Sequence, residues 1–198
     1  MIGGPALAGD ALTAFFARDA EEVARSLLGC RFMVGMVGGL IVETEAYFPD
    51  DAASHSFRGP SKRNAAMFGE PGNVYVYHIY GMHWCVNFVC RPGSAVLIRA
   101  LEPEQGIAEM AERRKLDALP ALCSGPGKLC QALGIDLTLN DRKLDCPPYA
   151  LFKGAAPVAT MVGPRIGITK NADAPMRFGV AGSRYLSKPF PKTSVSIP

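Results

Sequence analysis

A β-hairpin expected near the middle of the chain constrains the fold more than any other feature of the sequence. Residues 73–80 and 84–90 are rich in aromatic and β-branched side chains, and a short turn containing Gly81 separates them. Strands that are adjacent in sequence and joined by tight turns favour a mainly antiparallel sheet. Further strands are expected at residues 31–37, 40–47, 94–101, 156–162, 165–169 and 177–181.

Short helices are expected before and after these strands. Asp10 and Asp19 are candidate N-caps, and the helix after Asp19 should run over residues 20–28 until Gly29 stops it. Pro103 suits the first turn of a helix that extends to about residue 116, because proline is well tolerated there. A last helix is expected over residues 124–134.

The composition is that of an ordinary globular protein. The chain has 198 residues, of which 48% are hydrophobic and 20% charged, and it contains no uninterrupted apolar run long enough to span a membrane. Because we find no repeat or linker, we expect one α+β domain over residues 10–198 after a flexible tail at residues 1–9. The net charge of +3, with basic residues in groups, is compatible with a polyanionic partner.

The cysteines and histidines do not predict a metal site. The six cysteines form no C-x-x-C pair, and the three histidines lack the spacing of a metal-binding helix. Nothing marks the chain as secreted, so reduced thiols are expected. We therefore expect no metal and no disulfide framework.

Two strands carry residues that suggest chemistry. On a strand, alternate side chains share a face, so Glu43, Glu45 and Tyr47 should project the same way. Tyr75 and Tyr77 should share a face of the expected hairpin for the same reason. Carboxylates beside aromatic rings suit a site that stacks a flat ring and acts on the bond next to it.

Two polar residues lie in strands that should be buried. Arg99 stands in an apolar segment, and a buried guanidinium requires a carboxylate partner, for which Glu45 is the natural candidate. Asn87 also has apolar neighbours, and its amide must find hydrogen-bond partners in the backbone or in a ligand. A purely structural role remains open for both residues. Tyr80, at the hairpin tip, should be exposed unless a partner receives it.

Two other motifs point to weaker possibilities. The segment around Lys128 lacks the spacing of a phosphate-binding loop, although a helix N-terminus with a lysine can bind one phosphate. Glu43 and Glu45 stand roughly 6–7 Å apart along a strand, as in some carbohydrate hydrolases, but they would act from the same side of a bond.

With these residues identified, the chain resembles the alkyladenine (3-methyladenine) DNA glycosylase family from about residue 24 to 187. The matching blocks are residues 41–47, which read IVETEAY, 53–55, 63–68, 75–83, which read YVYHIYGMH, 97–103 and 122–133. The resemblance implies one domain with a curved antiparallel sheet and surrounding helices. It also implies a monofunctional enzyme that hydrolyses the N-glycosidic bond of damaged purines and leaves an abasic site without any cofactor.

The resemblance implies the following roles. Glu45 is the catalytic residue, Arg99 helps hold the attacking water, and the backbone carbonyl of Ile166 contacts that water. The residues that line the base pocket are Tyr47, His55, Tyr77 and Asn87, the last of which disfavours guanine. The residues that enter the duplex at the flipped nucleotide are Tyr80 and Met82.

The same resemblance implies double-stranded DNA as the partner. Phosphate contacts are expected from Arg58, Lys62, Arg63 and Lys128. The absence of a long N-terminal extension is typical of bacterial members, so we expect a cytoplasmic protein at the nucleoid. We also expect a monomer, because a one-domain repair enzyme needs no partner to form this site. Among the lesions, 3-methyladenine, 7-methylguanine, hypoxanthine and ethenoadenine all remain open. The main alternative is a non-catalytic nucleic-acid reader that stacks bases on tyrosines, which would leave Glu45 and Arg99 unexplained.

Overall fold

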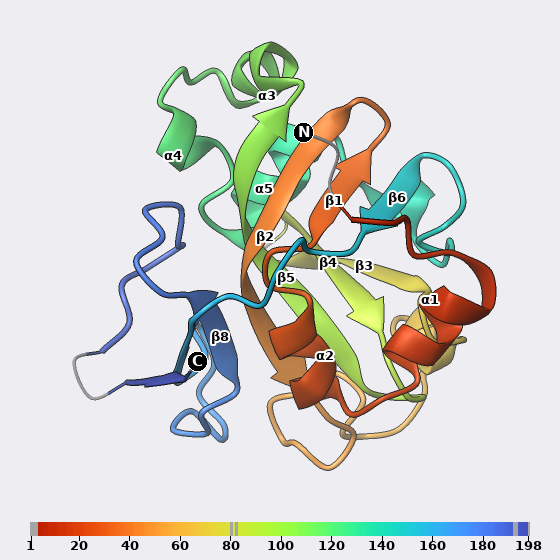
Figure 1. Cartoon of the computed structure of the whole chain (residues 1–198). Coiled ribbons are helices and arrows are strands. Elements are labelled where there is room, and N and C mark those ends of the chain that lie inside the picture. The colour runs from red at the N-terminus through yellow and green to blue at the C-terminus, as the bar shows by residue number, and fades with distance from the viewer. Residues whose placement is uncertain (1–3, 80, 82, 192–193, 198) are drawn as a thin grey trace.

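The framework of the protein is one curled antiparallel sheet with helices around it (Figure 1). The structure is a computed structural model, and it describes residues 4–79, 81, 83–191 and 194–197. In this part of the chain the strand order is β3-β4-β5-β2-β8-β7-β9, and β1 pairs with both β2 and β6. The expected α+β class with a curved, mainly antiparallel sheet is confirmed.

The elements have the following bounds. The strands are β1 (Arg31–Val34), β2 (Val37–Tyr47), β3 (Val74–Ile79), β4 (His83–Val89), β5 (Ala95–Gln105), β6 (Tyr149–Phe152), β7 (Thr160–Gly163), β8 (Arg177–Val180) and β9 (Val195–Ile197). The helices are α1 (Gly9–Phe16), α2 (Ala20–Ser26), α3 (Ile107–Arg114), α4 (Leu119–Leu122), α5 (Pro126–Leu133) and the 3₁₀ helices η1 (Ala65–Phe68) and η2 (Leu137–Leu139).

Strand β2 is the centre of the sheet. It pairs with β5 over most of its length, with β1 through its first half and with β8 through Glu43–Glu45. The register between β2 and β5 shifts beside Glu43, so Ala100 lies opposite Glu43 and Ile98 opposite Thr44, whereas Arg99 has no residue directly opposite. Such bulges re-aim side chains and occur often next to active sites.

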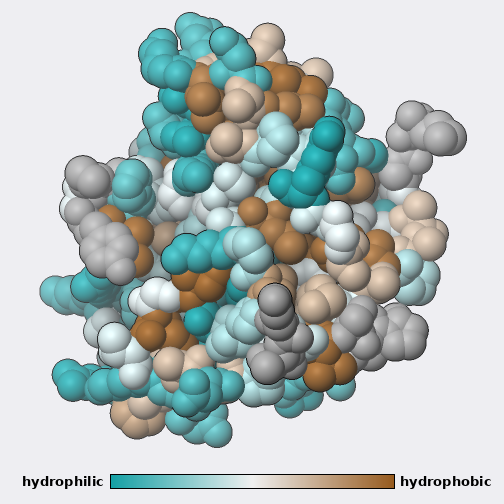
Figure 2. Space-filling model, turned by 90° about the vertical axis from the view of Figure 1, so that its left-hand side faces the viewer, coloured by the Kyte–Doolittle hydropathy of each residue, from teal (hydrophilic) through white to brown (hydrophobic). Residues whose placement is uncertain are grey.

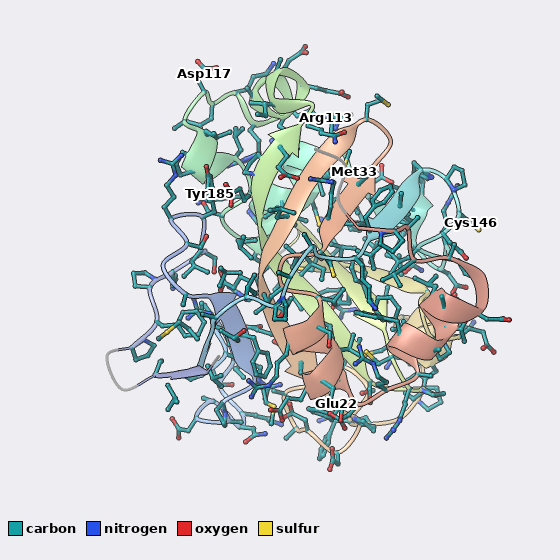
Figure 3. The ribbon with its side chains drawn as sticks, in the orientation of Figure 1. Glu22, Met33, Arg113, Asp117, Cys146 and Tyr185 are labelled. Atoms are coloured by element: carbon teal, nitrogen blue, oxygen red, sulfur yellow. The ribbon has the colours of Figure 1, made fainter. Side chains whose placement is uncertain are left out.

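The core lies between the sheet and the helices. Phe88 of β4 makes edge contacts with Phe16 of α1 and Phe32 of β1, with ring centroids 5.9 and 5.0 Å apart. The buried Leu129 and Leu133 of α5 belong to the same core. Polar side chains such as Glu22 and Asp117 point outward (Figure 3), and apolar patches on the surface are interspersed with hydrophilic residues (Figure 2).

The expected hairpin and the helix that Gly134 ends are confirmed, whereas the helix expected to start at Pro103 is wrong. Strand β5 continues through Pro103, which pairs with Gly39, to Gln105. A side chain at position 39 would collide with the backbone of β5, so glycine permits this close pairing. The long pairing with β2 therefore overrides the local preference, and α3 begins only after Gly106, which has φ +67°.

Other expected boundaries also differ from the structure. Residues 165–169 form no strand, because the side chain and backbone there bond to β2 and its neighbouring loop instead of to a strand partner. The segment expected as one strand at 31–37 divides at a turn into β1 and the start of β2. Strands β6 and β9 were not expected.

The segment before α1 contacts β6. Ala6 forms an antiparallel bridge with Phe152, and the buried Leu7 donates a backbone hydrogen bond to Leu151. We expected this segment to form a flexible tail, and residues 6 and 7 are instead attached to the sheet. No helix among the described residues is long and apolar enough to cross a membrane.

The cap of α2 yields a stability prediction. The carboxylate of Asp19 accepts a hydrogen bond from the backbone N–H of Glu21, as expected for an N-cap. Asp10 does not cap α1, because that helix begins at Gly9 with Ala8 at the cap position and no side-chain bond. We expect Asp19→Ala to lower the free energy of unfolding by about 1 kcal/mol, measured by urea denaturation. Asp10→Ala is the matched control, and an equal loss in both variants would contradict the capping role.

Candidate active site

The carboxylate of Glu45 is the centre of a buried polar cluster on β2. Its side chain is 0% exposed. Oε1 accepts a 2.8 Å hydrogen bond from the backbone N–H of Ile166 and lies 3.2 Å from Nη1 of Arg99. Oε2 accepts a 2.8 Å hydrogen bond from the Tyr47 hydroxyl. Two hydrogen bonds and one ion pair, from three segments of the chain, therefore fix this carboxylate.

Glu43 is engaged on all sides by other groups. Its Oε1 accepts from Nε of Arg177 at 2.7 Å, from Nε of Arg99 at 3.2 Å and from Oγ of Ser187 at 2.7 Å. Its Oε2 accepts from the backbone N–H of Ser187. A carboxylate offers about four acceptor positions, so Glu43 has little capacity left to bind a water or a substrate. Its role is to hold the two arginines.

Arg99 bridges the two carboxylates. Nε contacts Glu43, Nη1 contacts Glu45 and Nη2 lies 3.4 Å from Oγ of Ser187. Burial would lower the pKa of Arg99, but the negative charges of Glu45 and Glu43 outweigh it and the pKa is raised. The guanidinium is therefore cationic, and the Arg99–Glu45 ion pair expected from the sequence is confirmed.

Tyr47 connects Glu45 to a second ion pair. Burial and the charge of Glu45 raise the pKa of Tyr47, so its hydroxyl stays protonated and donates. The guanidinium of Arg165 lies over its ring, 4.6 Å from the centroid, and forms an ion pair with Asp51. Arg165 also donates to the backbone carbonyl of Ala46 at 3.0 Å.

Two adjoining cavities open beside this cluster. The first, here called the aromatic pocket, has a volume of about 160 Å³, and its walls include Tyr47, His55, Tyr75, Tyr77 and Asn87. The second, here called the arginine cavity, has a volume of about 250 Å³, and its walls include His83, Arg99, Pro126, Gly127 and Ile166. Tyr47 and Tyr77 line both, so the two rings stand at their boundary.

The aromatic pocket is built from flat rings held by hydrogen bonds. The rings of Tyr75 and Tyr77 lie 5.4 Å apart, and His55 meets Tyr77 edge-on at 4.5 Å. Nδ1 of His55 lies 3.0 Å from the Tyr75 hydroxyl, a contact that the sequence did not suggest. Burial and the positive charge of Arg63 lower the pKa of His55, so the imidazole is neutral at pH 7.

Asn87 contributes an amide to the same pocket. It is buried on β4, opposite Tyr75 of β3, and its Nδ2 donates to the Tyr75 carbonyl at 3.0 Å. This bond fixes the amide against the strand, while the side chain still lines the aromatic pocket. The structural and ligand-binding interpretations of Asn87 are therefore compatible.

Ile166 contacts Glu45 through its backbone N–H, a contact that the sequence did not suggest. The resemblance assigned its carbonyl to the attacking water, and that contact stays a prediction. Residues Tyr80 and Met82, expected to enter the duplex, lie outside the described residues.

The expected phosphate-binding residues are all exposed and belong to two segments. Arg58, Lys62 and Arg63 belong to the loop that follows His55. Lys128 lies in the first turn of α5, and Pro126 and Gly127 of that turn line the arginine cavity.

Four residues of the site were not singled out from the sequence: Asp51, Arg165, Arg177 and Ser187. Arg177 offered a signal, because it begins a short apolar strand just as Arg99 lies in one. Asp51 and Ser187 lie in polar segments that carried no signal, because their contacts are made with partners more than 100 residues away in the chain.

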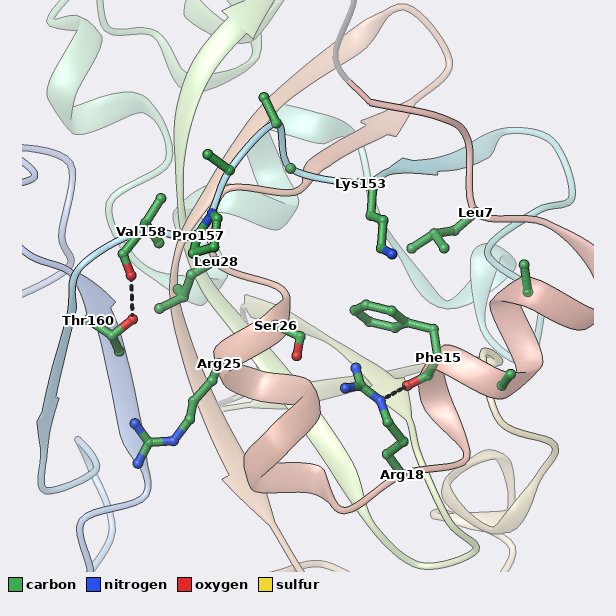
Figure 4. Close-up of a pocket in the computed structure, with 15 residues that line it drawn as sticks. Leu7, Phe15, Arg18, Arg25, Ser26, Leu28, Lys153, Pro157, Val158 and Thr160 are labelled. Carbon is green, nitrogen blue, oxygen red and sulfur yellow. Dashed lines mark hydrogen bonds between the residues drawn. The ribbon is translucent and has the colours of Figure 1, made fainter. Parts of the chain in front are cut away.

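A larger cavity lies elsewhere, between α1, α2 and residues 153–158 (Figure 4). It has a volume of about 890 Å³ and its walls include Arg18, Arg25 and Lys153. None of the described residues that line it is an aspartate or glutamate, so it lacks a general base. Among the described residues, moreover, no group of three or more His, Cys, Asp or Glu side chains could hold a metal ion.

Comparisons with known proteins agree with the resemblance. The sequence model of the family described as Methylpurine-DNA glycosylase (MPG) matches residues 14–184. A Rhizobium etli protein is 72% identical over 96% of this chain and 94% of its own length. A Rhizobium johnstonii protein is 67% identical over 96% and 95%, and an Agrobacterium fabrum protein 56% identical over 89% and 91%. All three are named "Putative 3-methyladenine DNA glycosylase".

Proposed function

Since the chain belongs to the methylpurine-DNA glycosylase family, we propose that it removes alkylated or deaminated purines from duplex DNA in DNA repair. A water activated by Glu45 hydrolyses the N-glycosidic bond and leaves an abasic site, with no metal or organic cofactor. The observation that carries this proposal is the buried Glu45 carboxylate, which is held by Arg99, Tyr47 and Ile166. These three residues line the arginine cavity, and Tyr47 also lines the aromatic pocket.

The aromatic pocket supports binding of a flipped purine. An enzyme that acts on a base within a duplex must first extrude the base. Extrusion costs on the order of a few kcal/mol, and the cost is lower at a damaged pair. Tyr47 and Tyr77 offer ring faces, which favour a cationic N-alkylpurine by roughly 0.5–2 kcal/mol over a neutral one. Asn87 would leave the 2-amino group of guanine unpaired and thereby disfavour the normal base.

The arginine cavity supports the chemical step. Glu45 accepts two hydrogen bonds and forms an ion pair with Arg99, which leaves at least one of its roughly four acceptor positions for a water. Glu45 removes the proton of that water as it attacks the anomeric carbon, and its charge stabilises the oxocarbenium character of the sugar. Arg99 forms an ion pair with Glu45 and thereby orients the carboxylate.

Engagement of the duplex involves three further groups. Tyr80 and Met82 fill the space that the flipped nucleotide leaves, which keeps the extruded state open. Some DNA phosphates contact Arg58, Lys62 and Arg63 in the loop after His55. Another phosphate contacts the N-terminal turn of α5 and its Lys128. The protein acts as a monomer on chromosomal DNA, at the bacterial nucleoid.

The test is single-turnover base release from duplexes that carry one hypoxanthine, one 7-methylguanine or no lesion. We expect free base and an abasic strand that breaks only after alkali treatment, because none of the described residues that line the two cavities is a lysine. Binding of every duplex without release of any base would instead favour the non-catalytic reader.

Lys128 provides a separate test of DNA binding. If its ammonium contacts a phosphate, Lys128→Ala should reduce the slope of log affinity against log salt by about 1, measured on an undamaged duplex. Lys115→Ala, which removes an exposed lysine at the end of α3, is the control and should leave the slope unchanged. Equal slopes for wild type and Lys128→Ala would exclude this contact.

A further inference from the structure

The structure assigns a specificity-determining role to Arg165, beyond the residues that the proposed reaction uses. We propose that its guanidinium, which lies behind the ring of Tyr47, weakens the binding of cationic purines relative to neutral ones. Asp51 tunes this effect by offsetting part of the charge. The inference rests on the proposed function, because it concerns a base stacked on Tyr47.

The position of Arg165 shows which face of Tyr47 is free. The guanidinium lies 4.6 Å from the ring centroid, and the Arg165 side chain is 0% exposed. That face of the ring is therefore closed by protein. Tyr47 is only half-buried and lines both cavities, so a ligand reaches it from the opposite face or the edge. A base stacked on Tyr47 has the ring between itself and the cation.

The charge of Arg165 is only partly satisfied by direct bonds. Nη1 contacts Asp51 and the carbonyl of Ala46, whereas Nε and Nη2 are buried with no hydrogen-bond partner among the described residues. The ring of Tyr47 is the remaining electron-rich group over which the guanidinium lies. Buried donors without partners are rare in proteins, and each of them calls for an explanation.

Asp51 is ionised at neutral pH. Burial would raise its pKa, but hydrogen bonds from Arg165, the backbone of Ala53 and the amide of Asn171 outweigh this effect and lower the pKa. The pair behind Tyr47 is therefore a cation against the ring and an anion bonded to the cation. Removing either partner changes the net charge behind the ring, in opposite directions.

The physical consequence depends on the charge of the base. An aromatic ring attracts a cation through the negative potential of its face. A cation on one face lowers the potential that the other face offers to a second cation, whereas a neutral purine stacks by dispersion and hydrophobic contact and is little affected. Arg165 thus shifts the balance toward neutral lesions such as hypoxanthine.

The experiment measures duplex affinity in a Glu45→Gln background, in which base release is blocked and no proton transfer complicates the comparison. The quantity is the affinity for a 7-methylguanine duplex, which carries a cationic base, divided by that for a hypoxanthine duplex. Arg165→Gln should raise this ratio about three- to tenfold. Arg165→Lys, which keeps the charge, should leave it near the background value, and Asp51→Asn should lower it.

The affinity ratio should rise in Arg165→Gln and fall in Asp51→Asn, and these opposite shifts distinguish an electrostatic effect from structural damage. If the substitutions only disturbed packing around Tyr47, Arg165→Gln and Asp51→Asn would shift the affinity ratio in the same direction or leave it unchanged. Either result would overturn the inference. If Arg165→Gln does not fold, Asp51→Asn alone decides by the sign of its shift. If the Glu45→Gln protein binds damaged and undamaged duplexes equally, the proposed function itself is contradicted. If it prefers the damaged duplexes but Arg165→Gln leaves the affinity ratio unchanged, only the role of Arg165 is contradicted.

Discussion

Glu45→Gln is expected to abolish base release while the protein still folds and binds the duplex. A general base contributes about 10²–10⁴ in rate, and the amide cannot accept the proton of the attacking water. Glutamine has nearly the shape of glutamate, and its amide oxygen can still accept from the N–H of Ile166 and from Arg99. The pocket walls should therefore remain in place.

The measurement is single-turnover release of hypoxanthine or 7-methylguanine, with duplex affinity determined in parallel. Glu102→Gln is the matched control, because it changes a partly exposed glutamate on β5 outside the described contacts of Glu45. Release at the wild-type rate by Glu45→Gln would show that another group activates the water. Loss of both release and binding would mean that the substitution damaged the fold.

The pairing of Glu45 with Arg99 could be predicted because burial imposes a strict demand. An arginine in a strand that is apolar on both faces has to meet a carboxylate, and few acidic residues stand in comparable strands. The hairpin of β3 and β4 was equally accessible, because alternating aromatic residues and a short turn determine it locally. In both cases the information lies within a short segment of the chain.

The rest of the site depends on contacts between distant segments. The bulge that lets Arg99 reach both Glu43 and Glu45 arises from the pairing of β2 with β5, which no short segment encodes. Arg165 was expected on a strand, but its side chain bonds to Asp51 and stacks on Tyr47, more than 100 residues earlier. A distant contact also explains why the helix expected to start at Pro103 is wrong, since pairing with β2 extends strand β5 through this residue. Local preference gives way where a distant partner supplies more contacts.

Arg99→Leu is expected to produce a large loss of stability. It leaves the buried carboxylate of Glu45 without a charged partner and Glu43 with Arg177 as its one remaining ion-pair partner among the described residues. Removing one partner of a buried ion pair costs about 3–5 kcal/mol, so the midpoint of thermal unfolding should fall by roughly 6–20 °C. Arg31→Leu is the control, because it removes a more exposed pair with Glu104 and should cost about 1 kcal/mol or less. Similar losses in both variants would contradict the importance of the buried cluster.

A double variant shows why the cluster is charged at all. Replacing both members of a buried ion pair by apolar residues is often neutral or stabilising, because no uncompensated charge remains. Arg99→Leu with Glu45→Leu should therefore recover part of the stability that Arg99→Leu alone loses, as urea denaturation would show, yet release no base. That result would mean that the pair is maintained for chemistry at the expense of stability. A double variant as unstable as Arg99→Leu alone would instead support the purely structural role that the sequence left open.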